Sequence, residues 1–320
     1  MAVPDVSVIV PARDAAATIG ATLAALGAQE FDGAYEVIVV DDGSVDGTGG
    51  IARAADVDVL VRHDVALGPA VARNAGRAAA SGRLLAYTDA DCAPAADWLA
   101  RGTAAVAAGA ELVQGAVAPD APVGPFDRTL SVAEAGPRFY ETANLFVTPE
   151  AFDRVGGFRA FVAPGPGLRP AQPTEHFGED IVFALEARRA GARFVFAPDA
   201  AVQHAVFPRG PRAFVAERRR LRYLPALVRE VPELRGSFLA GLWLAPRTAK
   251  FDLALAGVAA AVVTRRRSPL AAVVPYAMTL RRGQLWRRSA WRENAARVAA
   301  DGVACFSLVE GSLAARTPVL

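Results

Sequence analysis

Cysteine is scarce in this sequence, and it has no basic leader before its first apolar run. The 320 residues include 2 cysteines, Cys92 and Cys305, so we expect neither a disulfide framework nor a cysteine-based zinc site. This scarcity is typical of a reducing, cytoplasmic compartment. The apolar run from Val6 to Val10 ends at Pro11. We interpret it as a buried strand and not as a signal peptide.

Long uncharged hydrophobic runs are also missing. In the carboxyl-terminal third, Leu253–Thr264 and Ser268–Leu280 contain 12 and 13 residues. A helix that spans a bilayer needs about 18 or more apolar residues. Arg265, Arg266 and Arg267 separate the two segments. Short apolar segments flanked by arginines can lie in a membrane interface or form a helical hairpin against it.

Charge is distributed unevenly along the chain. Residues 1–200 contain 15 Arg against 26 Asp and Glu, whereas residues 201–320 contain 20 Lys and Arg against 7 Asp and Glu. The basic carboxyl-terminal region is expected to contact something anionic. One interpretation is a lipid phosphate or the anionic cytoplasmic leaflet of a membrane. The other is a helical subdomain that completes an acceptor cleft or forms a homodimer. We expect no nucleic-acid partner.

The first 200 residues alternate between strand and helix patterns. Strands are predicted at Val6–Val10, Tyr35–Val40, Asp58–Val61, Arg83–Thr88 and Arg193–Phe196. Helices are predicted at 18–28, 48–55, 69–80 and 180–190. Gly- and Pro-rich stretches between about Pro119 and Pro173, including Ala163–Pro173, predict loops. The alternation predicts an α/β fold with a mostly parallel sheet and helices on both faces.

Two carboxylates follow the fourth predicted strand, in the triplet Asp89-Ala90-Asp91. Ligands of parallel α/β sheets bind beyond the carboxyl ends of the strands. Side chains two residues apart can point into one cleft and hold a divalent cation that bridges a diphosphate. Taken alone, the triplet is equally typical of a solvated turn. Its position after a buried strand favours the metal site.

Two other strand ends are polar as well. Asp41 and Asp42 end the second strand and can accept hydrogen bonds from a nucleoside, although a turn that caps the next helix would have the same residues. Pro11, Ala12 and Arg13 end the first strand. Arg13 can approach a base or a phosphate there.

Further candidates lie on two of the predicted helices and after the last strand. Arg73 can offset diphosphate charge or lie on the surface, and Asn74 follows it in a helix of small residues. Glu179 and Asp180 open a helix, where the dipole favours their ionised form, so either can serve as a general base or simply start the helix. His204 is either a metal ligand or a core histidine.

In their order along the chain, these segments resemble the inverting glycosyltransferases of family 2, which have the GT-A fold. The matching segments are Val6–Arg13, Tyr35–Ser44, Gly68–Gly76, Asp89–Asp91, Val155–Phe158 and Gly178–Asp180. The resemblance covers about residues 5–205. It implies a GT-A domain over residues 1–207, followed by a basic, apolar helical region over residues 208–320.

The resemblance also implies a role for each matching residue. It implies Asp180 as the catalytic base, with Glu179 beside it, and Asp91 as the ligand of Mn²⁺ or Mg²⁺, with His204 completing the metal site. On the acceptor side it implies Asn144, Gly157 and Phe158. It implies a nucleotide-sugar pocket formed by Pro11, Ala12, Arg13, Asp41, Asp42, Arg73, Asn74, Asp89 and Ala90.

Two departures from the family pattern limit what the resemblance implies. Asp14 stands where many members have Asn. No Gln-x-x-Arg-Trp follows the catalytic region, because the order within Gln284–Arg288 is different. We therefore do not expect processive polysaccharide synthesis.

The predicted reaction transfers a sugar from a UDP- or GDP-linked donor to a hydroxyl acceptor with inversion, in a metal-dependent way. The acceptor is not specified by these residues, and a lipid-linked one would suit the basic region. A nucleotidyltransferase is a rival, but the amino terminus lacks a Gly-rich phosphate loop with a basic residue. The other alternative is a non-catalytic membrane-surface scaffold built on a degenerate transferase domain.

Overall fold

The computed structural model describes residues 3–134, 140–159, 177–280 and 288–320. The Gly- and Pro-rich segment at 163–173 and the Gln284–Trp286 part of the tail lie outside these residues. The chain divides into two compact units. Unit 1 comprises residues 1–123, 128–162 and 170–207, and unit 2 comprises 124–127, 163–169 and 208–320.

Unit 1 contains a sheet of 8 strands in the order β3-β2-β1-β4-β7-β6-β8-β5. The strands are β1 (Val6–Ala12), β2 (Tyr35–Asp42), β3 (Val59–His63), β4 (Leu84–Tyr87), β5 (Cys92–Pro94), β6 (Leu112–Pro119), β7 (Leu145–Val147) and β8 (Phe194–His204). The first four strands pair in parallel, and so do β6 and β8. Strand β7 pairs antiparallel with β4 and β6, and β5 pairs antiparallel with β8, so the sheet is mixed and less parallel than the sequence predicts.

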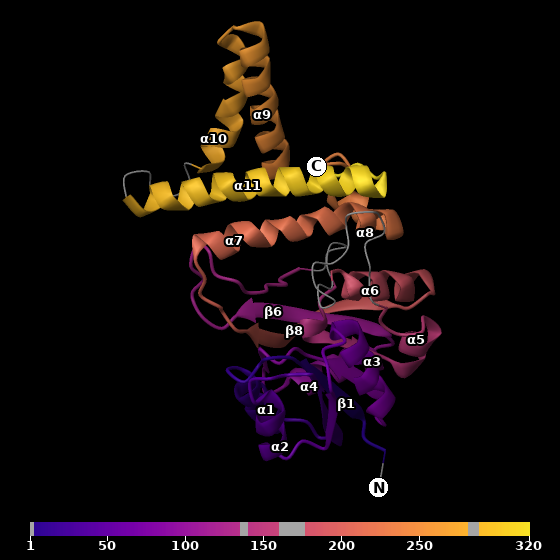
Figure 1. Cartoon of the computed structure of the whole chain (residues 1–320). Coiled ribbons are helices and arrows are strands. Elements are labelled where there is room, and N and C mark those ends of the chain that lie inside the picture. Colours follow the sequence, from indigo (N-terminus) through magenta and orange to yellow (C-terminus); the bar gives the residue numbers. More distant parts are fainter. Residues whose placement is uncertain (1–2, 135–139, 160–176, 281–287) are drawn as a thin grey trace. The chain divides into compact units, whose positions relative to one another are not determined.

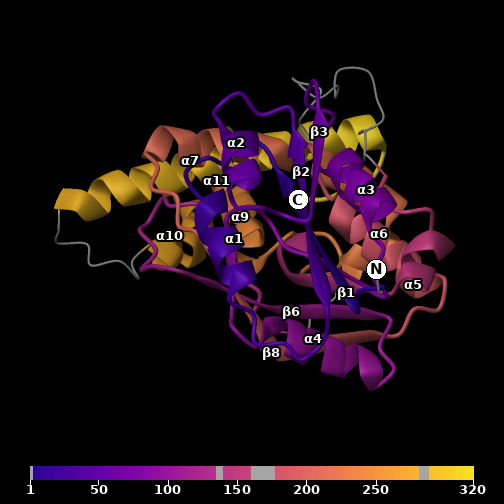
Figure 2. The same ribbon diagram turned by 90° about the horizontal axis from the view of Figure 1, so that it is seen from below.

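Helices cover both faces of this sheet (Figures 1 and 2). The helices of unit 1 are α1 (Ile19–Gly27), α2 (Thr48–Ala54), α3 (Pro69–Ala79), α4 (Trp98–Ala107), α5 (Pro149–Arg154) and α6 (Glu179–Arg189), with a short 3₁₀ turn, η1 (Thr142–Asn144). Every second residue of β1, from Val6 to Val10, packs with α1, α2 and α4 in one core. The opposite face packs on α3, where Gly76 lies against Ile9. Alternation along β1 thus supplies both cores.

The parallel pairing brings the predicted polar strand ends to one edge of the sheet. Ala12 on β1 lies opposite Asp41 on β2, and Ile9 lies opposite Tyr87, the last residue of β4. The loops after β1, β2 and β4 therefore begin side by side. This edge carries the candidate site.

Unit 2 is helical. Its elements are α7 (Pro211–Glu217), η2 (Arg218–Tyr223), α8 (Leu224–Glu230), η3 (Pro232–Ser237), α9 (Pro246–Thr264), η4 (Ser268–Val273), α10 (Val274–Leu280) and α11 (Arg288–Ala315). Phe251, Ala254 and Tyr276 join α9 to α10 in a small core. Asp301 of α11 accepts hydrogen bonds from Arg247 of α9 and from Tyr276 of α10.

Helix α11 is longer and more apolar than the sequence pattern suggested. Over Ala290–Ala315 it has the length and composition of a membrane-crossing helix, and 33% of its most apolar window is buried within the protein. Asp301 and Glu310 interrupt its most apolar part, so the helix contains no long uncharged run. Length and composition alone are equally typical of a core helix.

Candidate functional site

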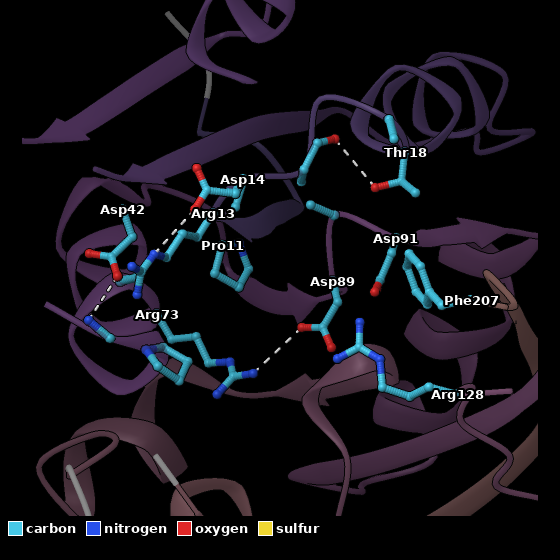
Figure 3. A pocket seen from close by; sticks show the side chains of 17 residues that line it. Pro11, Arg13, Asp14, Thr18, Asp42, Arg73, Asp89, Asp91, Arg128 and Phe207 are labelled. Carbon is cyan, nitrogen blue, oxygen red and sulfur yellow. Dashed lines mark hydrogen bonds and ion pairs between the residues drawn. The ribbon is translucent and has the colours of Figure 1, made fainter. Parts of the chain in front are cut away.

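A pocket of about 450 Å³ opens at the edge of the sheet where β1, β2 and β4 end (Figure 3). Its lining comes from the loop after β1, the start of α3, the loop after β4, and two residues from later in the chain. The lining includes Pro11, Arg13, Asp42, Arg73, Asp89, Asp91, Arg128 and Phe207. A cleft of this size, with convergent charged groups at strand ends, suits a small polar ligand.

The loop after β1 forms one wall of the pocket. Pro11, Ala12 and Arg13 all line it, as does Asp14. Asp14 has φ +48, and its Oδ1 accepts a hydrogen bond from the Val45 amide. Asn and Asp adopt this left-handed conformation more readily than most residues. The exchange of the more common Asn for Asp at position 14 is therefore compatible with the same loop.

The two aspartates that end β2 accept hydrogen bonds from the protein's own backbone amides. Asp42 lines the pocket, but its two oxygens accept hydrogen bonds from the Leu67 and Gly68 amides, and His63 Nδ1 lies 2.7 Å from Oδ1. Asp41 is fully buried and accepts a hydrogen bond from the Ser44 amide. Its Oδ2 is buried without a hydrogen-bond partner among the described residues. The geometry assigns both residues to shaping the loops, and Asp41 is not part of the lining.

Asp91 and His204 lie together, as the sequence predicted for a metal site. His204 Nε2 is 3.6 Å from Asp91 Oδ1, because Cys92 on β5 pairs with His204 at the end of β8. One donor atom each from Asp91, Cys92 and His204 lie within 4.8 Å of one another. Burial raises the pKa of the Cys92 thiol. Carboxylate and imidazole side chains are both common ligands of divalent metal ions.

Asp89 faces the same pocket and lacks full charge compensation. Burial raises the pKa of its carboxyl, the Asp91 carboxylate adds to this effect, and the Arg73 guanidinium opposes it. Asp89 Oδ1 is 3.5 Å from Arg73 Nη2. A divalent cation held beside Asp89 and Asp91 would relieve the repulsion between these carboxylates.

Arg73 connects the two acidic ends of the site. It is 6% exposed, so the surface alternative is wrong. Its Nη1 donates a 2.9 Å hydrogen bond to Glu179, while Nη2 faces Asp89. Arg73 lines the pocket from α3 and holds the start of α6 close to the end of β4. It belongs to this ion-pair network as much as to the pocket surface.

Asp180, at the start of α6, has a carboxyl that is only weakly acidic. Burial raises its pKa to about 7, and the neighbouring Glu179 carboxylate adds to the shift. Burial therefore outweighs the helix dipole, which by itself favours the ionised form as the sequence predicts. The Ile181 amide does donate a 2.8 Å hydrogen bond to Asp180 Oδ1. A carboxylate with a pKa near neutrality is well suited to accept a proton.

Glu141 is a carboxyl that sequence reasoning missed. It is hydrogen-bonded to Asp180, and burial together with the charges of Asp180 and Asp89 raises the pKa of Glu141 well above its ordinary value. The raised pKa favours the protonated form of Glu141, which can donate a hydrogen bond to the Asp180 carboxylate. Its backbone is held in place by Gln114 of β6, whose Oε1 accepts the Glu141 amide at 2.9 Å.

Asn144 is the last residue of the η1 turn and does not line the pocket. It is fully buried, its Oδ1 accepts the Trp98 indole N–H, and its Nδ2 donates to the carbonyls of Ala116 and Ala200. All its polar atoms are used inside the unit. The structure therefore does not bring Asn144 to an acceptor, and places it where it supports the η1 turn and Glu141.

Asn74 and Phe158 are likewise joined to each other instead of lining the pocket. The Asn74 side chain donates to the Phe158 carbonyl at 2.6 Å and accepts from the Phe158 amide at 2.9 Å. Gly157 has φ +82, and a Cβ there would lie 2.7 Å from Asn74 Oδ1. The Phe158 ring is 3% exposed and packs on Tyr87 and Phe183. These residues hold the Gly156–Phe158 turn against α3.

Arg128 and Phe207 complete the pocket, and sequence reasoning missed both. Their backbones form an isolated antiparallel bridge, and the Arg128 guanidinium lies 4.7 Å from the centre of the Phe207 ring. Arg128 projects into the same pocket as Asp89 and Asp91 (Figure 3). No local signal marks Arg128, since the partner that positions it lies far along the chain.

Comparisons with known proteins agree on one family. The family model "Glycosyl transferase family 2" matches residues 7–163. Glycosyltransferase AglE of Haloferax volcanii is 33% identical over 196 residues, which cover 57% of this chain and 64% of that protein. The pre-mycofactocin glycosyltransferase of Mycobacterium tuberculosis is 29% identical over 219 residues, or 62% of this chain and 42% of that protein. The chain thus matches less than two thirds of each relative.

Two solved structures resemble the whole chain. One is the mannosyltransferase PcManGT from Pyrobaculum calidifontis in complex with GDP-Man and Mn²⁺, with a TM-score of 0.65, 25% identity, and coverage of 95% of this chain and 87% of that one. The other is S. aureus TarS in complex with UDP-GlcNAc, with a TM-score of 0.51, 16% identity, and coverage of 97% and 91%. The second likeness concerns the fold alone.

Proposed function

The chain belongs to glycosyltransferase family 2 and has the GT-A fold, and from that premise we propose that it transfers a sugar from a nucleotide-diphosphate donor to an acceptor hydroxyl. The observation that carries the proposal is a cluster of carboxylates joined by Arg73, which bonds Glu179, the neighbour of Asp180, and lies 3.5 Å from Asp89, two residues before Asp91. Solved structures with this fold hold GDP-Man or UDP-GlcNAc, which supports a nucleotide-sugar donor.

In the proposed reaction, Asp180 is the base of a single displacement. The acceptor oxygen forms a bond with the anomeric carbon while its proton passes to the Asp180 carboxylate. The bond between the anomeric carbon and the diphosphate breaks, and the nucleoside diphosphate leaves with the bonding electrons. Attack from the face opposite the leaving group inverts the configuration. Glu141 holds Asp180 in place and keeps a second proton beside it.

Asp91 and His204 would hold a divalent cation, with Asp89 beside them. Such an ion stabilises the charge that develops on a departing diphosphate. We favour Mn²⁺ over Mg²⁺, because an imidazole nitrogen is part of the donor set. The Mn²⁺ present in the PcManGT complex supports a divalent cation in this fold. Arg128, which lines the same pocket, is positioned to pair with a diphosphate oxygen.

The acceptor is proposed to be a hydroxyl compound that receives one sugar at a time. The absence of a Gln-x-x-Arg-Trp sequence supports non-processive transfer. A lipid-linked acceptor at the cytoplasmic face of a membrane is consistent with the basic unit 2. A homodimer is the alternative use of that unit.

Donor turnover with Mn²⁺ or Mg²⁺ tests the proposal. We expect the protein to hydrolyse or transfer from one member of a UDP- and GDP-sugar panel, and Asp180→Asn to lose at least about a thousandfold in kcat. Donor affinity should change less than about threefold in that variant. The matched control is Asp153→Asn, which removes an exposed carboxylate that pairs with Arg77 on the surface. Binding without turnover for every donor and acceptor would favour the scaffold alternative, and full activity of Asp180→Asn would remove Asp180 from the mechanism.

A further inference from the structure

Large apolar side chains are exposed far more densely in unit 2 than in unit 1. Among the described residues, 21 large hydrophobic side chains are exposed, and 14 of these lie at Leu239 or beyond. Exposed apolar residues scattered singly need no explanation, but a concentration marks an interaction surface. Apart from Leu239, these exposed residues fall into two groups, one on the hairpin of α9, η4 and α10 and one on α11.

The two limbs of the hairpin are uncharged from Leu253 to Thr264 and from Ser268 to Leu280, and both expose apolar side chains. Helices α9 and α10 project side by side from α11 within unit 2 (Figure 1). The faces that meet contain Phe251, Gly257 and Tyr276, whereas Val262 and Val263 are 72% and 81% exposed. The other exposed apolar residues of the hairpin are Leu253, Leu255, Val258, Leu270, Val274 and Met278. Its limbs are covered on one side only.

Helix α11 has an apolar stripe on the side opposite its buried one. Ala296, Ala300, Ala304 and Leu308 follow one another at intervals of four and are buried. At 100° per residue, the exposed residues fall on the opposite side of the helix. They are Trp291, Val298, Phe306, Val309 and Leu313, with exposures from 39% to 77%. A stripe of this kind is unusual on the water-facing side of a helix.

The charges beside these apolar residues indicate what covers them. Between Leu253 and Leu280 the chain has three cations, Arg265, Arg266 and Arg267, and no carboxylate. All three arginines are exposed at the turn of the hairpin. If two copies paired through this surface, arginines would meet arginines, and no carboxylate between Leu253 and Leu280 would offset their charge. An anionic lipid surface satisfies both the apolar limbs and the arginines.

Dimensions restrict how the hairpin can meet a bilayer. Twelve residues of α helix are about 18 Å long, against a hydrocarbon core of about 30 Å. Insertion by the tip would leave three arginines near the centre of the bilayer, at about 2.5–3.5 kcal/mol each on insertion scales. Lying in the interface, the limbs reach about 5–10 Å into the acyl boundary and the arginines reach lipid phosphates.

We propose that the α9–α10 hairpin, with the three arginines at its turn, binds the interface of an anionic lipid bilayer. The occupant is the phospholipid surface, recognised by its phosphates and its acyl boundary. This proposal does not depend on the sugar-transfer reaction, because its residues lie in unit 2 and its test measures lipid binding.

Vesicle co-sedimentation at low salt tests the surface. The full chain should bind vesicles that contain phosphatidylglycerol at least about tenfold more tightly than vesicles of phosphatidylcholine alone. Replacing Arg265, Arg266 and Arg267 together by Gln should weaken binding about a hundredfold, since each arginine near the surface contributes roughly tenfold or less. Val262→Ser with Val263→Ser should weaken it about tenfold by removing apolar contact.

Matched controls separate these effects from loss of folding. Val45→Ser with Val65→Ser removes two exposed valines of unit 1, at 93% and 64% exposure, and should leave vesicle binding unchanged. Circular dichroism should match for all variants. Equal binding to both kinds of vesicle, or equal losses in the unit 1 control, would overturn the proposal. So would a dimer in sedimentation velocity that Val262→Ser with Val263→Ser dissociates, because that result assigns the surface to a second copy.

Discussion

At the scale of single residues, two opposing effects act on the Asp180 carboxyl. The amino terminus of α6 and the Ile181 amide favour its ionised form, whereas burial and the Glu179 carboxylate disfavour it. Burial is the largest of these effects and raises the pKa to about 7. A proton acceptor with this pKa is free at physiological pH and still basic enough to remove a proton from a hydroxyl during attack.

The raised pKa of Asp180 should make the free energy of unfolding depend on pH, which can be measured without an assay of activity. Because folding raises the pKa of Asp180, the folded state keeps a proton between the ordinary Asp value and about 7 that the unfolded chain has lost. Asp180 therefore favours folding at low pH, and this contribution is lost as pH rises through about 7. We expect Asp180→Asn to be more stable than the wild type at high pH by up to about 4 kcal/mol, at about 1.4 kcal/mol for each pH unit between the ordinary Asp pKa and about 7. Denaturant unfolding should show this gain shrink toward low pH, and a constant difference would contradict it.

A second residue-scale prediction concerns the hydrogen bond between Glu141 and Asp180. Gln at position 141 can still donate to Asp180 but carries no titrating proton. Glu141→Gln should therefore leave the acidic limb of the kcat–pH profile nearly in place, because one neutral donor replaces another. Glu141→Ala should lower kcat and move the acidic limb to higher pH, because the Asp180 carboxylate loses a hydrogen-bond donor. An unmoved limb in both variants would remove Glu141 from the site, and Glu111→Gln, at a surface ion pair with Arg154, is the control.

The metal ligands allow a third comparison between neighbouring side chains. His204→Ala should weaken Mn²⁺ binding by about 10–100-fold. Cys92→Ser should change it little, because burial keeps the thiol protonated and a hydroxyl is of similar size. Isothermal titration of the metal into each variant measures both effects. Loss of binding in Cys92→Ser alone would make the sulfur the ligand.

At the scale of elements, the approach of α3 to β1 decides where Arg73 lies. Gly76 permits this approach, because a Cβ there would lie 2.3 Å from Ile9 Cγ2. Without that contact α3 could not lie close to the sheet with its arginine between Glu179 and Asp89. A small residue in a helix thus positions a charged one a turn away.

The element-scale prediction contrasts two glycines in helices. Gly76→Ala should lower the free energy of unfolding by about 1–3 kcal/mol through overpacking. Gly50→Ala lies in α2 with nothing within 4 Å of the added Cβ. It should be neutral or stabilise by up to about 1 kcal/mol, because Ala favours the helix. Chemical denaturation measures both, and similar values for the two variants would contradict the close approach at Gly76.

At the scale of the whole molecule, the acidic strand ends of unit 1 and the cationic apolar surface of unit 2 differ in the ligand they should bind. Unit 1 gathers carboxylates around a pocket, a composition that favours cations and ligands bound through them. Unit 2 has an excess of arginines and exposed apolar side chains. The same chain therefore offers two surfaces of opposite electrostatic character.

Ligand binding should distinguish the two units in thermal unfolding. Mn²⁺ with a cognate nucleotide sugar at about 100 times its Kd should add about 2.7 kcal/mol of stability to the unit that binds it. We expect the midpoint temperature of the unfolding of unit 1 to rise by several degrees when the ligands are present. EDTA should abolish this rise. Calorimetry with and without donor measures the shift. A rise that persists in EDTA would contradict a metal-dependent site.

The sequence by itself determined β1–β4, β8, α1–α3 and α6 of unit 1, together with the strand ends that form the pocket. It did not indicate β5, β6 or α4, and β7 and α5 lie where Gly- and Pro-rich loops were predicted. Val6–Val10, Tyr35–Val40 and the helices at 18–28 and 69–80 all appear in the structure near their predicted bounds. Periodicity is a local property, because alternating side chains and helical stripes follow from backbone geometry within a few residues. The order of polar strand ends along the chain was enough to indicate the family.

Only the tertiary structure decided which way the polar side chains face. Asn74 and Asn144 turned out to hold the backbone, whereas Glu141 and Arg128 lie at the site without any local signal. Each of these roles depends on partners far along the chain, such as Phe158 for Asn74 and Phe207 for Arg128. Residue type sets what a side chain can bind, but distant segments decide whether its polar atoms remain free to bind a ligand.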